Sequence, residues 1–181
     1  MDLGFVGFGL IGGSIARAVR ANPKTSRWRM TAWSPSGNGP AKALTERVID
    51  VAATSPEAAV TEADLVILAA PATACLTLID QLVGPWRNQL RPDAVVTDVA
   101  STKARIVDRA DSAGLWFVGG HPMAGLEMAG YGASEAGLFV DRPWIIVPGA
   151  LAGPSDVARV IELATACRAR VVQMDATAHD R

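Results

Sequence analysis

The stretch "GFVGFGLIGGSIARAV", residues 4–19, decides the fold. The apolar run Leu3–Val6 predicts a β-strand, and apolar side chains recur at helical spacing in the second half of the stretch. Between them, Gly7, Gly9 and Gly12 form the pattern G-x-G-x-x-G. In this pattern the first glycine permits a tight turn, the second lets a pyrophosphate approach the backbone, and the third lets helix and strand pack closely. The helix N-terminus adds free N–H groups and a positive dipole end. The stretch therefore predicts a dinucleotide site, against the alternative of a tight strand–helix turn without a ligand.

The rest of the chain repeats this alternation of strand and helix. Further apolar runs, separated by amphipathic helical patterns, are Met30–Trp33, Leu65–Ala70, Ala94–Thr97, Leu115–Val118, Trp144–Val147 and Arg170–Met174. Continuous apolar strands of this kind indicate a largely parallel sheet that is covered on both faces. We therefore predict one doubly wound α/β domain of the Rossmann type over residues 1–174. The Gly-rich segment 119–142 is interpreted as a functional loop with one short helix.

Composition narrows the class of partner. The chain has 181 residues, half of them apolar, and a formal net charge of −1. One substantial core is expected, and charges that are scattered rather than clustered favour a small-molecule partner over nucleic acid or a membrane. A cytoplasmic protein is expected, because no apolar run reaches membrane-spanning length and no signal peptide is recognisable. Cys75 and Cys167 are interpreted as buried reduced thiols rather than a disulfide or metal ligands, and no metal site is predicted.

The predicted cofactor contacts lie where three strands end. They are Gly7, Phe8, Gly9, Leu10, Ile11 and Gly12 after the first strand, Ser34 and Ser36 after the second, and Ala70 and Pro71 after the run Leu65–Ala70. Ser34 stands where an NAD site usually has an acid that accepts a hydrogen bond from the adenosine ribose. Both serines can donate to a 2′-phosphate, and Lys42 can reach it. The sequence therefore leans slightly to NADP over NAD, unless these serines are ordinary turn residues.

The stretch "GGHPMAG", residues 119–125, contains one of only two histidines in the chain. Glycine and proline mark a turn that aims the side chain of His121 in a definite direction. The run before this turn ends at the same sheet edge as the run before Ser101, so His121 is predicted at the mouth of the nicotinamide crevice with Ser101 facing it. A neutral imidazole, with an ordinary pKa of about 6.5, suits a general base. The alternative is a histidine that only braces the turn.

On these residues the sequence resembles the prephenate and arogenate dehydrogenases of tyrosine biosynthesis. The resemblance rests on "GFGLIGGS" (7–14), "DVASTK" (98–103), "GGHPMAGLEMAG" (119–130), "LFVDRPWIIVP" (138–148) and "DATAHDR" (175–181). It covers essentially the whole chain in order, and the histidine motif is its most specific part. It implies NAD(P)-dependent oxidative decarboxylation to 4-hydroxyphenylpyruvate or tyrosine. A ring alcohol loses its proton to a base and hydride to the nicotinamide, and loss of carbon dioxide makes the ring aromatic.

The resemblance also implies roles for individual residues. His121 would be the catalytic base, with Ser101 hydrogen-bonding beside it. Glu127 would lie at the entrance and modulate substrate access, and His179 would lie near the substrate. A solvated loop carboxylate and a histidine near a helix start are common alternatives for these last two. Lys103 is interpreted as a surface residue without a role.

The sequence departs from the family pattern at its end. Family members continue into a helical domain that forms a homodimer and supplies arginine to the substrate carboxylates, and residues 175–181 are interpreted as the start of that domain. Each charge-assisted hydrogen bond to the substrate contributes about 1.5–3 kcal/mol. We therefore expect this chain to bind dinucleotide but to turn over prephenate poorly. The competing interpretations are another β-hydroxyacid-type dehydrogenase and a non-catalytic nucleotide-sensing module.

Overall fold

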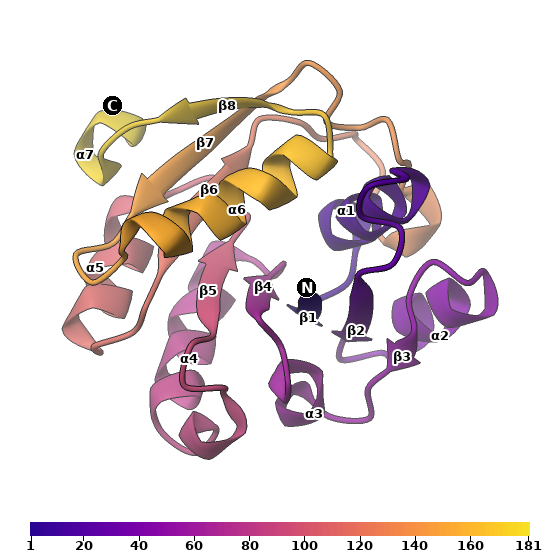
Figure 1. Cartoon of the computed structure of the whole chain (residues 1–181), viewed down its shortest axis with the longest axis horizontal. Coiled ribbons are helices and arrows are strands. Elements are labelled where there is room, and N and C mark those ends of the chain that lie inside the picture. The colour runs from indigo at the N-terminus through magenta and orange to yellow at the C-terminus, as the bar shows by residue number, and fades with distance from the viewer.

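The computed structural model describes all residues, 1–181 (Figure 1). The strands are β1 (Asp2–Val6), β2 (Arg29–Trp33), β3 (Val51–Ala52), β4 (Leu65–Leu68), β5 (Val95–Asp98), β6 (Val118–Pro122), β7 (Pro143–Pro148) and β8 (Arg170–Gln173). The α-helices are α1 (Leu10–Ala21), α2 (Asn38–Thr45), α3 (Pro56–Val60), α4 (Ala72–Val83), α5 (Ala104–Ser112), α6 (Pro154–Ala166) and α7 (Ala176–His179). Two 3₁₀ helices, η1 (Arg87–Gln89) and η2 (Tyr131–Ala133), complete the set.

The strands form a largely parallel sheet. Five parallel strands are ordered β3-β2-β1-β4-β5, and a second set is ordered β6-β7-β8. A parallel bridge between Val96 and Phe117 links β5 to β6, and only the β6–β7 pair is antiparallel. The predicted α/β class is therefore confirmed. Strand order reverses between β1 and β4, which is where open α/β sheets bind ligands.

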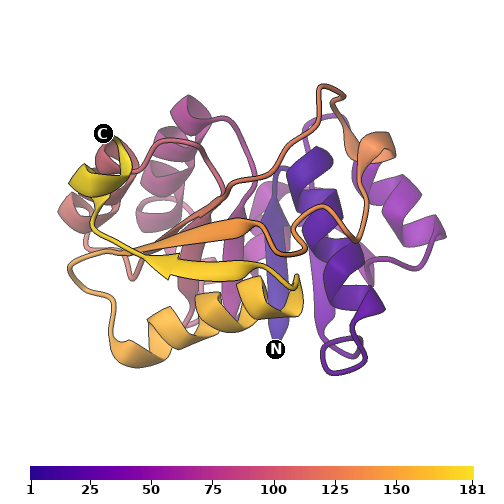
Figure 2. The same ribbon diagram turned by 90° about the horizontal axis from the view of Figure 1, so that it is seen from above.

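Helices cover both faces of this sheet, as a doubly wound fold requires. Leu65 and Ile67 of β4 point into a core shared with α1 and α6, whereas Val66 and Leu68 point into a core shared with α3, α4 and α5. Figure 2 shows α6 and the α4–α5 pair on opposite sides of the strands. A strand with both faces buried has no polar alternation, which explains the continuous apolar runs in the sequence.

Two expectations about strands were wrong. The short strand β3 (Val51–Ala52) was not predicted, because its two residues are too few to show a pattern. The run predicted at Leu115–Val118 is shifted, since β6 spans Val118–Pro122 and places His121 in a strand rather than in a turn. Gly120 makes this possible, because a Cβ there would lie 2.6 Å from the carbonyl oxygen of Asp98. The predicted loop therefore begins only after Pro122, and η2 is its short helix.

Both cysteines are free and buried, which confirms the interpretation of reduced thiols. Burial raises the pKa of the Cys75 thiol to about 12, so it stays protonated at neutral pH. None of the helices combines the length and the hydropathy needed to cross a bilayer.

Candidate active site

A cavity of about 810 Å³ lies at the carboxyl ends of β1, β2 and β4. Its walls are mostly apolar. The loops after these strands provide Gly7, Phe8, Gly9, Ser34, Pro35, Ser36, Ala69, Ala70 and Pro71, and α2, α4 and the η2 segment provide the opposite walls, including Lys42, Thr77, Leu78 and Tyr131. A concave site of this size at the strand-order reversal suits an extended small molecule such as a dinucleotide.

The three motif glycines have different surroundings. Gly7 has a φ of +89°, and a Cβ there would lie 2.4 Å from the carbonyl oxygen of Ala69. A Cβ at Gly12 would lie 3.2 Å from the Cβ of Ala69, so α1 and the end of β4 pack closely. A Cβ at Gly9 would meet nothing within 4 Å. Because no side chain caps α1, the open space at Gly9 lies beside unpaired N–H groups that an anion can accept.

Most of the predicted cofactor contacts line this cavity. Gly7, Phe8, Gly9, Ser34, Ser36, Ala70 and Pro71 are among its walls. Leu10, Ile11 and Gly12 are not, because they form the first turn of α1. We therefore expect these three residues to contact a cofactor only through their backbone N–H groups.

The end of β2 carries no acidic side chain in the cavity. Ser34 is 8% exposed, and its hydroxyl oxygen is buried without a hydrogen-bond partner. An unpaired buried hydroxyl costs free energy, which a polar ligand group would offset. Lys42 also lines the cavity, and its ammonium lies 3.9 Å from a carboxylate oxygen of Glu46. The Ser34 hydroxyl and the Lys42 ammonium are both groups that can donate hydrogen bonds to a ligand at the end of β2.

Tyr131, which sequence reasoning missed, holds the loop after β6 over the cavity. Its ring stacks on Phe8, with the ring centroids 5.4 Å apart. Its hydroxyl donates to Glu46 at 2.7 Å, and the guanidinium of Arg17 lies 4.7 Å from its ring centroid. The hydrogen bond from Tyr131, together with Arg17, holds the pKa of Glu46 below its usual value. The only sequence signal was an aromatic residue between Gly130 and Gly132.

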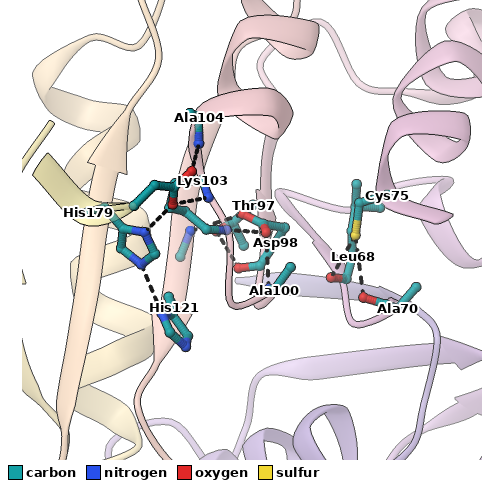
Figure 3. A network of polar contacts seen from close by, with 12 residues as sticks. Leu68, Ala70, Cys75, Thr97, Asp98, Ala100, Lys103, Ala104, His121 and His179 are labelled. Carbon is teal, nitrogen blue, oxygen red and sulfur yellow. Dashed lines mark hydrogen bonds and ion pairs between the residues drawn. The ribbon is translucent and has the colours of Figure 1, made fainter. Parts of the chain in front are cut away.

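His121 lies at the same sheet edge as the cavity. Because β6 continues parallel to β5, the N–H of Gly120 donates to Asp98 at 3.2 Å, and His121 follows beyond the carboxyl end of β5. The Nδ1 atom of His121 lies 2.8 Å from Nε2 of His179, and Nδ1 of His179 lies 2.7 Å from a carboxylate oxygen of Asp180. Figure 3 shows the second ring nitrogen of His121 pointing away from this pair. It makes no hydrogen bond within the protein.

The surroundings of His121 keep its imidazole neutral. Burial lowers its pKa to about 4, and the neighbouring His179 and Lys103 act in the same direction. Only Asp180 opposes the shift. A neutral imidazole can accept a proton at physiological pH.

Lys103 is not a surface residue, contrary to the expectation. Its side chain and that of Asp98 are both fully buried, and they form an ion pair between the end of β5 and the start of α5. The Asp98 carboxylate also accepts from the N–H groups of Ala100 and Gly120, at 3.0 and 3.2 Å. Burial raises the pKa of Asp98 and lowers that of Lys103, and each charge opposes the shift of the other. The pair therefore joins β5, β6 and α5 beneath the two histidines.

The remaining predicted residues are more isolated. Ser101 lies between β5 and α5, at the same edge as His121, but its side chain is exposed and no hydrogen bond joins the two. Glu127 is exposed in the loop after β6 and pairs with no other side chain. Neither of them lines the cavity, nor does His121 or His179. The roles of all four residues stay predictions.

Fold and cavity together define a nucleotide-binding domain of the Rossmann class. The chain belongs to the prephenate dehydrogenase family, since residues 15–173 match the family described as prephenate dehydrogenase, nucleotide-binding domain.

Individual relatives agree with this assignment. Prephenate dehydrogenase of Bacillus subtilis is 35% identical over 177 residues, which is 96% of this chain and 46% of that protein. The crystal structure of Synechocystis arogenate dehydrogenase matches with a TM-score of 0.89 and 28% identity, over 99% of this chain and 61% of that one. The Aquifex aeolicus prephenate dehydrogenase complex with hydroxyphenyl propionate and NAD+ matches with a TM-score of 0.87 and 26% identity, over the same shares of the two chains. The chain thus spans about half the length of the curated relatives that it matches.

Proposed function

We propose that this chain binds NAD or NADP in the cavity and is the cofactor-binding part of a dehydrogenase that oxidatively decarboxylates prephenate or arogenate. The observation that carries the proposal is the neutral, half-buried imidazole of His121 at the sheet edge where the cavity opens. The family match and the NAD+ complex of the Aquifex aeolicus relative support it.

The residues of the cavity fit this cofactor. The pyrophosphate would lie against Gly9 and the first turn of α1, and the adenosine ribose against Ser34 at the end of β2. A ligand can form hydrogen bonds with the unpaired hydroxyl of Ser34 and with the free N–H groups at the uncapped start of α1. The bound cofactor would supply a nicotinamide as the hydride acceptor for the ring carbon of the substrate.

His121 would handle the proton in the same step. Its neutral ring would accept the proton of the ring alcohol as the C–H bond breaks. The electrons released when carbon dioxide leaves would complete the aromatic ring, and the imidazolium would return the proton to the ring oxygen, which becomes a phenol. We place Ser101 beside this histidine, Glu127 at the entrance and His179 next to the substrate. We assign residues 1–174 to the nucleotide domain and 175–181 to the start of a helical domain, through which the longer protein would form a homodimer.

Calorimetric titration with NAD and NADP tests the cofactor site, and Gly9→Ala is the decisive variant. Its added methyl group would enter open space, so the fold should be unaffected, but it would occupy the place of the pyrophosphate. We expect affinity for either nucleotide to fall about tenfold or more, a loss of roughly 1.4 kcal/mol, with little change in Tm.

Gly137→Ala is the matched control, because a Cβ there also meets nothing within 4 Å and Gly137 does not line the cavity. It should bind like the wild type. If the wild-type chain bound neither nucleotide, or if both alanine variants bound equally well, the proposed cofactor site would be wrong.

We further propose that NADP is preferred over NAD. In Ser34→Asp, the new carboxylate would repel a 2′-phosphate but accept a hydrogen bond from a ribose hydroxyl. We expect NADP affinity to fall about tenfold or more while NAD affinity is kept, as measured by titrating both nucleotides into both proteins. An unchanged ratio of the two affinities would argue against a 2′-phosphate next to Ser34.

A further inference from the structure

We propose that Asp180 is a positioning residue that fixes the protons of the histidine pair, so that Nε2 of His121 is held as a bare proton acceptor. The catalytic meaning of this arrangement rests on the proposed function. The proton arrangement itself is a property of the chain alone and can be measured without cofactor or substrate.

Two backbone N–H groups hold the carboxylate of Asp180 in place. One carboxylate oxygen accepts from the backbone N–H of Lys103 at 2.9 Å, and the other accepts from that of Ala104 at 2.9 Å. These groups form the start of α5, which has no side-chain cap of its own. Partial burial raises the pKa of Asp180, but hydrogen bonds from His179 and from these N–H groups outweigh it and leave the pKa below its usual value. Asp180 is therefore an ionised group that can only accept hydrogen bonds.

Because Asp180 can only accept hydrogen bonds, it determines which nitrogen of the His179 ring carries a proton. Nδ1 of His179 lies 2.7 Å from Asp180, so this nitrogen must carry a proton. We infer that the His179 ring carries only this one proton, and a neutral imidazole that donates from Nδ1 can only accept at Nε2. Nε2 of His179 lies 2.8 Å from Nδ1 of His121, so His121 donates from Nδ1. The neutral ring of His121 is then left with an unprotonated Nε2, which is the nitrogen that makes no hydrogen bond within the protein.

The contacts around the pair hold this geometry in place. The side chain of His179 is 4% exposed, so water has little access to the bond between the rings. The start of α7 is capped by Asp175, which accepts from the N–H of Ala178 at 2.8 Å, and its end is tied to α5 through Asp180. Figure 3 shows the polar contacts running from Ala104 and Lys103 to His179 and on to His121.

Nitrogen NMR on the isolated chain tests this directly, because only two histidines contribute signals. In ¹⁵N-histidine-labelled protein at pH 7.5, we expect Nδ1 to be protonated and Nε2 unprotonated in both rings. A spectrum in which His121 carries its proton on Nε2, or in which His179 is doubly protonated and donates to His121, would overturn the proposal.

The variant Asp180→Ala tests the cause. It removes the acceptor that Nδ1 of His179 faces, so this nitrogen no longer has to carry the proton and both rings can adopt the other tautomer. The matched control is Asp175→Ala, which removes the carboxylate at the other end of α7 without touching a histidine. Each substitution removes one helix cap, so the two variants should be similarly stable. We expect the tautomer signals to change in Asp180→Ala only. Unchanged signals in that folded variant would refute the role of Asp180.

Turnover measurements distinguish a failure of the role proposed for Asp180 from a failure of the proposed function. In this chain fused to the C-terminal half of a relative, Asp180→Ala should lower kcat/KM by up to about 10⁴-fold, the loss when a general base is held in the wrong tautomer, with little change in cofactor affinity. If NMR shows the expected tautomers but replacing His121 leaves turnover intact, the proposed function fails and the proton arrangement stands. If the tautomers are reversed while His121 is still required for turnover, the role of Asp180 fails alone.

Discussion

Replacing Lys103 with methionine should lower the free energy of unfolding by about 3–5 kcal/mol, because the buried carboxylate of Asp98 loses its cation. Methionine is similar in length, so the loss comes from the uncompensated charge rather than from a large cavity. In a chain of this size it corresponds to a fall in Tm of roughly 10 °C. Denaturant unfolding followed by circular dichroism measures the change.

Two further variants identify the cause of that loss. Lys24→Met removes an exposed lysine that forms no ion pair, and its effect should stay within about 0.5 kcal/mol. The double variant Asp98→Asn/Lys103→Met contains no buried charge and should regain at least half of the lost stability. If Lys103→Met were as stable as Lys24→Met, the ion pair would not support the site as described.

Replacing His121 with asparagine should abolish most of the turnover of this chain when it is fused to the C-terminal half of a relative. Asparagine keeps a polar side chain but has no basic nitrogen, so kcat/KM should fall by about 10²–10⁴-fold. Affinity for the dinucleotide should stay within about twofold, since His121 does not line the cavity. A nucleotide-sensing module would not need this residue. Equal loss of affinity and turnover would therefore count against a catalytic role, and assays with other hydroxyacids would expose a different dehydrogenase.

The pH dependence of the same protein provides a second measurement. Burial, together with His179 and Lys103, depresses the pKa of His121 to about 4 against the opposing charge of Asp180. The active, neutral ring therefore persists as pH falls, and kcat/KM should decline only as pH approaches about 4. The pH profile of kcat/KM reports groups of the free enzyme. A decline centred near the ordinary histidine value of about 6.5 would show that the ring is not shielded in this way.

The sequence predicted those parts of the molecule that depend on local pattern. Gly7, Gly9 and Gly12 located the first turn and the cavity, because backbone conformation and close packing act on neighbouring residues. The continuous apolar runs predicted the parallel sheet for the same reason. Even so, the position of β6 was missed, because its glycines resemble a turn until β5 and β7 are placed on either side of them.

Contacts between distant residues could not be predicted in this way. Nothing near Lys103 in the sequence shows that its side chain folds back into a buried pair with Asp98. Asp180 stands 77 positions from the backbone N–H of Lys103 that it accepts from, and 58 positions separate the two histidines. Such pairings follow from where α7 lies after β8, which depends on the whole sheet.

The residues that line the cavity and the residues that orient His121 come from different parts of the chain. Every wall of the cavity is built before Ala133, whereas the state of the imidazole at position 121 is set by the last turn of the chain. We expect a variant without α7 and Asp180 to bind the nucleotide as before, but the protonated nitrogen of His121 would no longer be fixed. Sequence change can therefore alter proton handling at one end of the chain without touching nucleotide recognition at the other.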